Sequence, residues 1–230
     1  MKPLIVEHSE PITLIGGGEV GENDLELALA VAPVLVAADG GADRAVARGH
    51  MPQAVIGDFD SVSDVVRRQV PPDRLFPVRE QDTTDFDKAL RHTRAPFLVG
   101  VGFLGGRVDH QLAVLNTLVR NAEKPCILLG AHEVLFHAPP RIELALNPAD
   151  VVSLFPLARV SGRSTGLEWP IDGLTFEPSG QIGTSNRSTG PVTIEVDLPG
   201  LLVIVPRGAF DLVTQAFRSA QRAQWPAHAE

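Results

Sequence analysis

The chain has 230 residues, of which 44% are apolar and 21% are charged, so it is not disordered and can bury the core of one large or two small domains. Acidic side chains outnumber basic ones by 28 to 20, and the formal net charge of -8 argues against nucleic acid or an anionic membrane as a partner. Ten of the 15 aspartates lie between Asp39 and Asp109. The single cysteine, Cys126, and the lack of a long apolar segment or signal peptide indicate an unprocessed cytoplasmic protein.

The first 140 residues alternate between apolar runs with strand character and stretches with helical periodicity. Strands are predicted at 12–15, 34–38, 54–56, 97–101 and 126–129, and helices at 24–31, 42–48, 85–93 and 108–122. Because the strand runs are almost entirely apolar, we expect both faces of their sheet to be covered. The pattern predicts an α/β domain over residues 1–140, with a mostly parallel sheet and flanking helices.

The pattern changes after two proline-containing turns, at 139–140 and 147–148. Short β-type runs then follow at 151–155, 174–176, 192–196 and 201–205, separated by clusters of Gly, Pro, Ser and Asp. This spacing predicts a small all-β sandwich domain over residues 147–230. A helix is predicted over 209–224, either packed outside the sandwich or forming a mobile tail.

A glycine-rich turn follows the first predicted strand. Residues 16–21 read GGGEVG, which matches G-x-G-x-x-G, and Asp39 ends the next strand, where a ribose-binding acid would lie. An NAD(P)-binding oxidoreductase is therefore one alternative. Three adjacent glycines match many spacings by accident, however, so a phosphate-binding or plain turn is favoured.

The segment Asp39-Gly40-Gly41 places a carboxylate and free backbone N–H groups where ligands of open α/β sheets bind. The alternative is that Asp39 caps the helix predicted to begin near Ala42.

Two carboxylates, Asp58 and Asp60, follow the third predicted strand. Residues two apart on an extended segment point the same way, and like charges this close are costly without a cation between them. Hard oxygen ligands of this kind suit Mg²⁺. The alternative is a solvated turn in which Asp60 or Ser61 caps the following helix.

The segment 81–90 is a polar turn that opens an amphipathic helix. Asp82 and Asp85 share a face near the helix N-terminus, where the helix dipole favours anions. By itself this is an ordinary helix start, but beside Asp58 and Asp60 it offers another metal carboxylate. Lys88 either reaches a phosphate or pairs with Asp85.

The segment 102–110 is a further strand-to-helix turn, and its Arg107 suits bidentate phosphate recognition. Asp109 and His110 face apart, and His110 is interpreted as structural. The sequence has no P-loop motif, no His/Cys group with zinc spacing and no Ser-His-Asp arrangement. Turns that follow parallel strands converge on one sheet edge, so together these motifs predict nucleotide-dependent phosphoryl or diphosphoryl transfer.

The ordered motifs resemble those of the thiamine pyrophosphokinase family, over roughly residues 12 to 205. They are residues 39–41, 57–61, 81–88 and 105–110, followed in the β-rich half by GLEWP at 166–170 and TSN at 184–186. The resemblance implies an α/β catalytic domain, a C-terminal β-sandwich and a homodimer with active sites between subunits. It implies ATP-dependent transfer of diphosphate to the hydroxyethyl group of thiamine, giving thiamine diphosphate and AMP.

The resemblance also implies roles by position. Mg²⁺ is expected at Asp58, Asp60 and Asp85. Gln81, Asp82, Arg107 and Asp109 would hold or orient the ATP phosphates and the attacking hydroxyl, with Asp82 and Asp109 as candidates for taking its proton. The nucleotide-binding residues expected are Asp39, Gly40, Gly41, Gln81, Thr84, Lys88 and Arg107.

Thiamine is expected to meet Ser185 and Asn186 across the dimer interface. The sequence departs from the family after Asn186, where residues 187–190 contain no aromatic side chain. Trp169 is then the nearest aromatic to stack on thiamine, unless it is a core residue. Two other functions stay open: diphosphoryl transfer to another small alcohol, such as a pterin-type hydroxymethyl compound, and a non-catalytic nucleotide or thiamine sensor.

Overall fold

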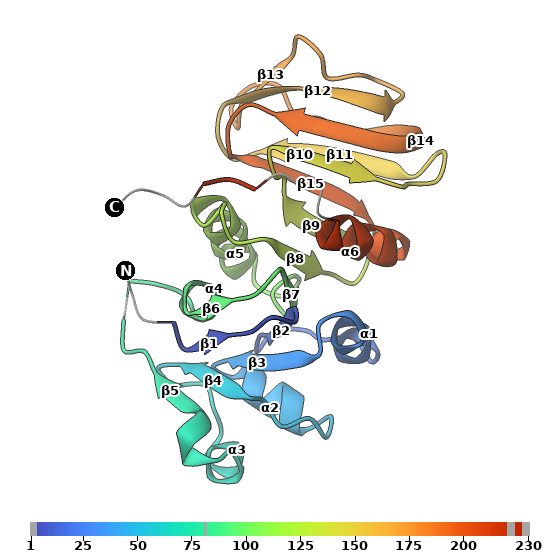
Figure 1. Ribbon diagram of the computed structural model, residues 1–230. Coiled ribbons are helices and arrows are strands. Elements are labelled where there is room, and N and C mark those ends of the chain that lie inside the picture. The colour runs from blue at the N-terminus through green and yellow to red at the C-terminus, as the bar shows by residue number, and fades with distance from the viewer. Residues whose placement is uncertain (1–3, 81, 220–223, 227–230) are drawn as a thin grey trace. The chain divides into compact units, whose positions relative to one another are not determined.

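The computed structural model describes residues 4–80, 82–219 and 224–226 (Figure 1). The chain folds as two compact units. The first is Met1–Thr117 with Leu128–Ala131, and the second is Leu118–Ile127 with His132–Glu230. None of the helices in the described ranges is long and apolar enough to cross a membrane.

Parallel strands form the centre of the first unit. They are β2 (Ile12–Ile15), β3 (Val34–Ala38), β4 (Ala54–Gly57), β5 (Leu75–Pro77) and β7 (Leu98–Val101), in the order β7-β2-β3-β4-β5. Every residue of β2, β4 and β7 is buried. The prediction of a parallel sheet covered on both faces is therefore confirmed for this unit. A short parallel pair, β1 (Val6–Glu7) with β6 (Thr93–Arg94), lies apart from this sheet.

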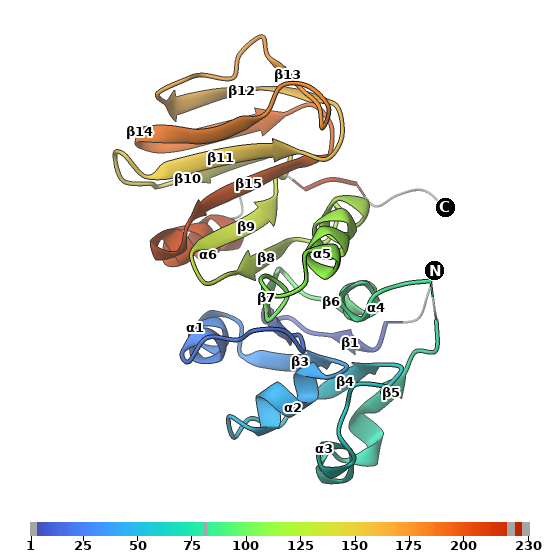
Figure 2. The ribbon, with the colours of Figure 1, turned by 180° about the vertical axis from the view of Figure 1, so that it is seen from behind.

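Helices connect these strands. They are α1 (Asp24–Val31), α2 (Gly41–Val46), α3 (Asp64–Gln69), α4 (Asp85–Arg91) and α5 (Val108–Arg120), with a 3-10 turn η1 (Pro72–Arg74). Hydroxyl caps fix two of the starts: Ser63 Oγ accepts the Val66 N–H at the start of α3, and Thr84 Oγ1 accepts the Asp87 N–H at the start of α4. The helices α1 and α2 lie on one face of the sheet and α4 on the other (Figures 1 and 2), as expected when crossovers between parallel strands are right-handed.

The second unit consists mainly of antiparallel strands. They are β9 (Glu133–His137), β10 (Arg141–Leu144), β11 (Val151–Pro156), β12 (Val160–Leu167), β13 (Thr175–Phe176), β14 (Gly183–Val196) and β15 (Leu201–Pro206). The long strand β14 pairs with β11 through its first half and with β10 and β12 through its second half. The strand β14 thus connects the ladder that contains β11 to the ladders formed with β10 and β12. The short strand β8 (Cys126–Leu129) falls at the division between the units, and burial of Cys126 raises the pKa of its thiol.

The predicted C-terminal helix is present as α6 (Phe210–Arg218), preceded by a 3-10 turn η2 (Arg207–Ala209). It packs against β9 within the second unit, where Phe217 meets Phe136 edge to face with ring centroids 5.2 Å apart. Burial of a phenylalanine contributes roughly 1.5–3 kcal/mol. The mobile-tail alternative is therefore wrong for residues 210–218. The helix was predicted to extend to residue 224, and residues 220–223 of that range lie outside the described residues.

Candidate active site

Four strand-to-helix turns meet at the carboxyl edge of the parallel sheet in the first unit. They follow β2, β3, β4 and β7 and comprise residues 16–18, 39–41, 58–61 and 102–107. Together with the start of α4 they line a cavity of about 770 Å³. The carboxyl ends of parallel strands lie at one edge, which is why segments far apart in the sequence share one cavity.

Asp39 organises the turn that carries the other two carboxylates. Its Oδ1 accepts the N–H of Phe59 at 2.7 Å and its Oδ2 accepts the N–H of Ser61 at 3.0 Å. The residue is 1% exposed, with a left-handed φ of 45°. Gly57 allows this approach, because a Cβ there would lie 2.7 Å from Asp39 Cβ. The alternative in which Asp39 caps α2 is wrong, since the N-cap is Gly40 and no side chain caps this helix.

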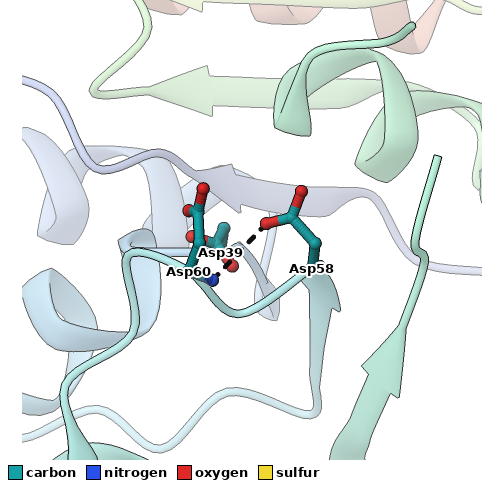
Figure 3. Close-up of side chains that lie close together, drawn as sticks. All are labelled: Asp39, Asp58 and Asp60. Atoms are coloured by element: carbon teal, nitrogen blue, oxygen red, sulfur yellow. Dashed lines mark hydrogen bonds between the residues drawn. The ribbon is translucent and has the colours of Figure 1, made fainter. Parts of the chain in front are cut away.

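Asp58 and Asp60 lie beside Asp39, and their carboxylates point to the same side of the turn (Figure 3). One oxygen from each of the three side chains lies within 4.8 Å of the others. The Ser61 hydroxyl donates to Asp60 Oδ1 at 2.8 Å. The alternative in which Asp60 or Ser61 caps α3 is wrong, because Ser63 is the cap. Three converging carboxylates are the donor set that hard divalent cations prefer.

Lys88 joins this cluster to α4. Its Nζ donates to Asp58 Oδ2 at 2.8 Å and to Asp85 Oδ1 at 3.1 Å, and its side chain is 2% exposed. The predicted pairing with Asp85 is therefore present, and the longer-range pairing with Asp58 was not predicted. Asp85, the third expected metal ligand, lines the same cavity.

The carboxyl groups of this cluster have pKa values that are shifted in opposite directions. The hydrogen bond from Lys88 lowers the pKa of Asp58. Burial raises the pKa of Asp85, against the opposing effect of Lys88. Burial also raises the pKa of Asp39, and the nearby charges of Asp85 and Asp60 add to this effect. Acids crowded in this way are stabilised in their charged form by a cation.

Arg107 lines the cavity from the turn that precedes α5. Its guanidinium makes a two-pronged pair with Asp109, from Nε to Oδ1 at 3.1 Å and from Nη2 to Oδ2 at 2.6 Å. Both side chains are exposed, and Arg107 lowers the pKa of Asp109 to about 2. Among the described residues, neither Asp109 nor Asp82 lines the cavity. Gln81 lies outside the described residues.

The remaining expected nucleotide residues divide by position. Gly40 and Thr84 line the cavity. Gly41 is buried against β2, where a Cβ would lie 1.9 Å from the carbonyl oxygen of Ile15. Packing therefore requires a glycine at position 41.

The expected thiamine residues belong to the second unit, where Asn186 holds the backbone of Trp169. The Asn186 Oδ1 accepts the N–H groups of Trp169 and Arg187, and its Nδ2 donates to the Trp169 carbonyl at 2.7 Å. Trp169 is 55% exposed, so the interpretation of Trp169 as a core residue is wrong. Ser185 is exposed, and its N–H donates to Ser153 Oγ.

Several cavity residues were not among the predicted site residues. They are Arg44, Glu80, Thr83, Phe103 and His110. The interpretation of His110 as structural is wrong, because His110 is exposed and lines the cavity. Arg91 of α4 pairs with both Glu80 and Asp87. The spacing of four residues between Asp87 and Arg91 is the sequence pattern that could have indicated this ion pair. Phe103 packs on Phe86 with ring centroids 4.6 Å apart.

The glycines at 16–18 have a packing explanation. A Cβ on Gly16 would lie 2.6 Å from the Phe103 ring, and one on Gly18 would lie 2.6 Å from the carbonyl oxygen of Gly102. These two glycines therefore permit close contact between neighbouring turns. A dinucleotide is not needed to explain them.

Two family models match the chain: the catalytic domain of thiamin pyrophosphokinase over residues 25–129, and its vitamin B1 binding domain over residues 141–201. The two matches together span well over half of the chain. The chain belongs to the thiamine pyrophosphokinase family. The family resemblance drawn from the ordered motifs is thereby confirmed.

Relatives and solved structures of the family agree with this assignment. Thiamine pyrophosphokinase 1 of Oryza sativa subsp. japonica is 28% identical over 201 residues, covering 71% of this chain and 76% of the relative. Thiamin pyrophosphokinase 1 of Caenorhabditis elegans is 25% identical over 175 residues, covering 67% and 71%. The thiamin pyrophosphokinase structure from Candida albicans superposes with a TM-score of 0.72 at 18% identity, covering 90% of this chain and 95% of that one. The fold of the chain is therefore that of this family.

Proposed function

We propose that the chain transfers the diphosphate of ATP to the hydroxyethyl group of thiamine, giving thiamine diphosphate and AMP. The observation that carries this proposal is the group of Asp39, Asp58 and Asp60 beside Lys88, at the edge of a cavity bordered by glycine turns. Membership of the thiamine pyrophosphokinase family supports the pair of substrates. The cavity volume of about 770 Å³ is within the usual range for small-molecule sites.

The cation that fits this donor set is Mg²⁺. Asp58 and Asp60 would hold the cation, with Asp85 as the third expected ligand. Asp39 would hold the turn in place by accepting hydrogen bonds from two of its backbone N–H groups. When bound, such a cation neutralises charge on the phosphates and orients them. The all-oxygen, acidic character of the cluster supports this choice over a softer metal.

The side chains of the chain contribute mainly positioning and charge. Lys88 fixes the spacing between Asp58 and Asp85 from a buried position. Arg107 offers a planar guanidinium to phosphate oxygens, and Asp109 orients it. In-line transfer to a hydroxyl depends on such positioning and charge neutralisation more than on covalent chemistry. Asp82 and Asp109 are the candidates for taking the hydroxyl proton.

In this proposal the two parts of the chain bind different substrates. Residues 1–140 form the catalytic domain that binds ATP and Mg²⁺, and residues 147–230 fold as a β-sandwich that binds thiamine. Asn186 holds the backbone of Trp169, and the exposed ring of Trp169 supports a stacking role. The resemblance to the family supports a homodimer in which one subunit presents thiamine to the catalytic domain of its partner. Buried Cys126, the single cysteine, supports a cytoplasmic location.

The proposal is tested by incubating the purified chain with ATP, Mg²⁺ and thiamine and measuring AMP and thiamine diphosphate by chromatography. Equal amounts of the two products are expected, with no AMP after chelation of the metal. A parallel reaction contains a pterin-type hydroxymethyl alcohol in place of thiamine. AMP release with that alcohol alone would favour the other diphosphokinase, and no release with either would favour a sensor. Tight NAD(P) binding without metal, measured by calorimetry, would favour the oxidoreductase.

A further inference from the structure

Arg44 lines the same cavity as the carboxylates, although it is not one of the predicted site residues. It lies in α2 shortly after Gly40 and Gly41 and is exposed. Its Nε donates to the carbonyl oxygen of Gly17 at 3.3 Å. Within the part of the chain that the structure describes, its two terminal amino groups make no hydrogen bond. The side chain therefore brings unused donors to the cavity wall.

The other two cations on the cavity wall are already paired. Lys88 lies between two carboxylates, and Arg107 is held by both oxygens of Asp109. Arg44 has no ion pair with any described residue. A permanently charged, planar guanidinium with free terminal amino groups is suited to an anion with several oxygens, above all a phosphate.

A neighbouring arginine separates two possible roles of Arg44. Arg48, one turn further along the chain, donates from Nη2 to the carbonyl oxygen of Val20 at 2.8 Å. Both arginines thus brace the glycine-rich segment 16–21. Arg48 does not line the cavity, whereas Arg44 does. Both arginines therefore support the glycine-rich segment, but only Arg44 of the two can reach a ligand in the cavity.

We propose that Arg44 binds a phosphate group of the nucleotide and holds it beside the turn at 16–18. The Nε contact with Gly17 fixes the plane of the guanidinium, so its terminal amino groups are oriented before the ligand arrives. A preorganised donor pair loses little side-chain entropy on binding. The identity of the ligand as ATP rests on the proposed function.

The proposal is tested by calorimetric titration with Mg²⁺ and α,β-methylene-ATP, in which the bond that the reaction would break cannot be cleaved. Because a hydrogen bond between charged groups is lost, Arg44→Gln is expected to bind the analogue about tenfold to a hundredfold more weakly. Arg44→Lys, which keeps the charge but not the fork, is expected to lose less. In steady-state assays, Arg44→Gln raises KM for ATP and leaves KM for thiamine unchanged.

Arg48→Gln is the matched control, and thermal unfolding checks that each variant is folded. Wild-type affinity in Arg44→Gln would overturn the proposal. So would an equal loss in Arg48→Gln, because the effect would then come from bracing the glycine turn. The binding measurement contains no thiamine. A wild-type chain that binds the analogue but releases no AMP with thiamine would thus contradict the proposed reaction and still support the nucleotide site.

Discussion

The buried ammonium group of Lys88 lies 2.8 Å from the carboxylate of Asp58, which comes 30 residues earlier in the chain. Because Lys88 also pairs with Asp85, Lys88→Met leaves two neighbouring carboxylates without their counter-ion. We expect the free energy of unfolding to fall by about 2 kcal/mol in chelator, less than for a fully buried pair because Asp85 is 38% exposed. Urea titrations measure the loss. Adding Asp58→Asn to Lys88→Met is expected to restore part of it, and an additive further loss would contradict the pairing.

Removal of either carboxylate of the turn is expected to affect turnover far more than stability. Asp58→Asn and Asp60→Asn each remove a ligand of the proposed cation, so AMP release is expected to fall on the order of 100-fold. Relief of like-charge crowding keeps the unfolding temperature of Asp60→Asn close to that of the wild type, whereas Asp58→Asn also removes one partner of the buried Lys88 and is expected to unfold at a somewhat lower temperature. Asp64→Asn, which changes an exposed carboxylate in the first turn of α3, is the control. Near-normal turnover in Asp58→Asn at the same Mg²⁺ concentration would rule out the metal assignment.

Asp39 is expected to act through the turn that it holds. In Asp39→Asn an amide N–H would face the backbone N–H of Phe59 or Ser61, so one hydrogen bond is lost and a buried donor is left unpaired. We expect a loss of about 1–3 kcal/mol in stability and a higher Mg²⁺ concentration for half-maximal turnover. Magnesium titration of AMP release measures the second effect. An unchanged Mg²⁺ requirement would show that Asp39 only supports the fold.

Asn186 is expected to control thiamine binding through Trp169. Asn186→Ala removes the side-chain bonds to the Trp169 backbone, so the backbone that carries the exposed ring is held less firmly. We expect KM for thiamine to rise about tenfold, as for the loss of roughly one net hydrogen bond, while KM for ATP stays constant. Trp169→Ala is expected to raise KM for thiamine further, and Trp169→Phe to recover part of the loss. Equal increases for both substrates would indicate general misfolding instead.

His137 in β9 gives the second unit a predictable response to acid. Burial lowers the pKa of His137 to about 4, and its Nε2 accepts the N–H of Gly200 at 2.8 Å. Between pH 6.5 and 4 the unfolded chain binds the proton and the folded chain does not, so stability falls as the pH falls. The loss attributable to this histidine is about 2 kcal/mol between pH 7.5 and 5.

The measurement for His137 is a urea titration at both pH values on the wild type and on His137→Gln, which stays neutral. The difference between the two proteins isolates the histidine from other titrating groups. We expect the variant to lose clearly less stability on acidification. Parallel losses in both proteins would show that His137 does not carry the effect.

The sequence was sufficient to predict the convergence of the turns that line the cavity, because their convergence depends on a simple property of parallel sheets. The runs ending near Ile15, Ala38 and Gly57 are apolar and β-rich, and polar residues follow each of them directly. Their strands pair in register, so the turns meet at one edge. The expectation required no knowledge of side-chain contacts.

Contacts between distant segments could not be predicted in this way. From the sequence, Asp39 could be either a ligand or a helix cap, because its hydrogen-bond donors, the backbone N–H groups of residues 59 and 61, lie some 20 residues further along the chain. In the second unit, β12 and the first half of β14 were missed, since their Ser, Thr and Gly residues resemble turns in isolation. They become strands because β12 pairs with β13 and mainly with the second half of β14, and the first half of β14 pairs with β11. Tertiary pairing overrides local preference there.

The central place of β2 has a consequence for synthesis on the ribosome. One edge of β2 pairs with β3, which follows soon after, but the other edge pairs with Leu98–Val101 of β7. A nascent chain shorter than about 100 residues therefore carries an apolar strand with one open edge, and such edges template aggregation. Slow translation between β4 and β7 would prolong this exposure. Codon choice and chaperone access over this interval should therefore influence the yield of folded protein.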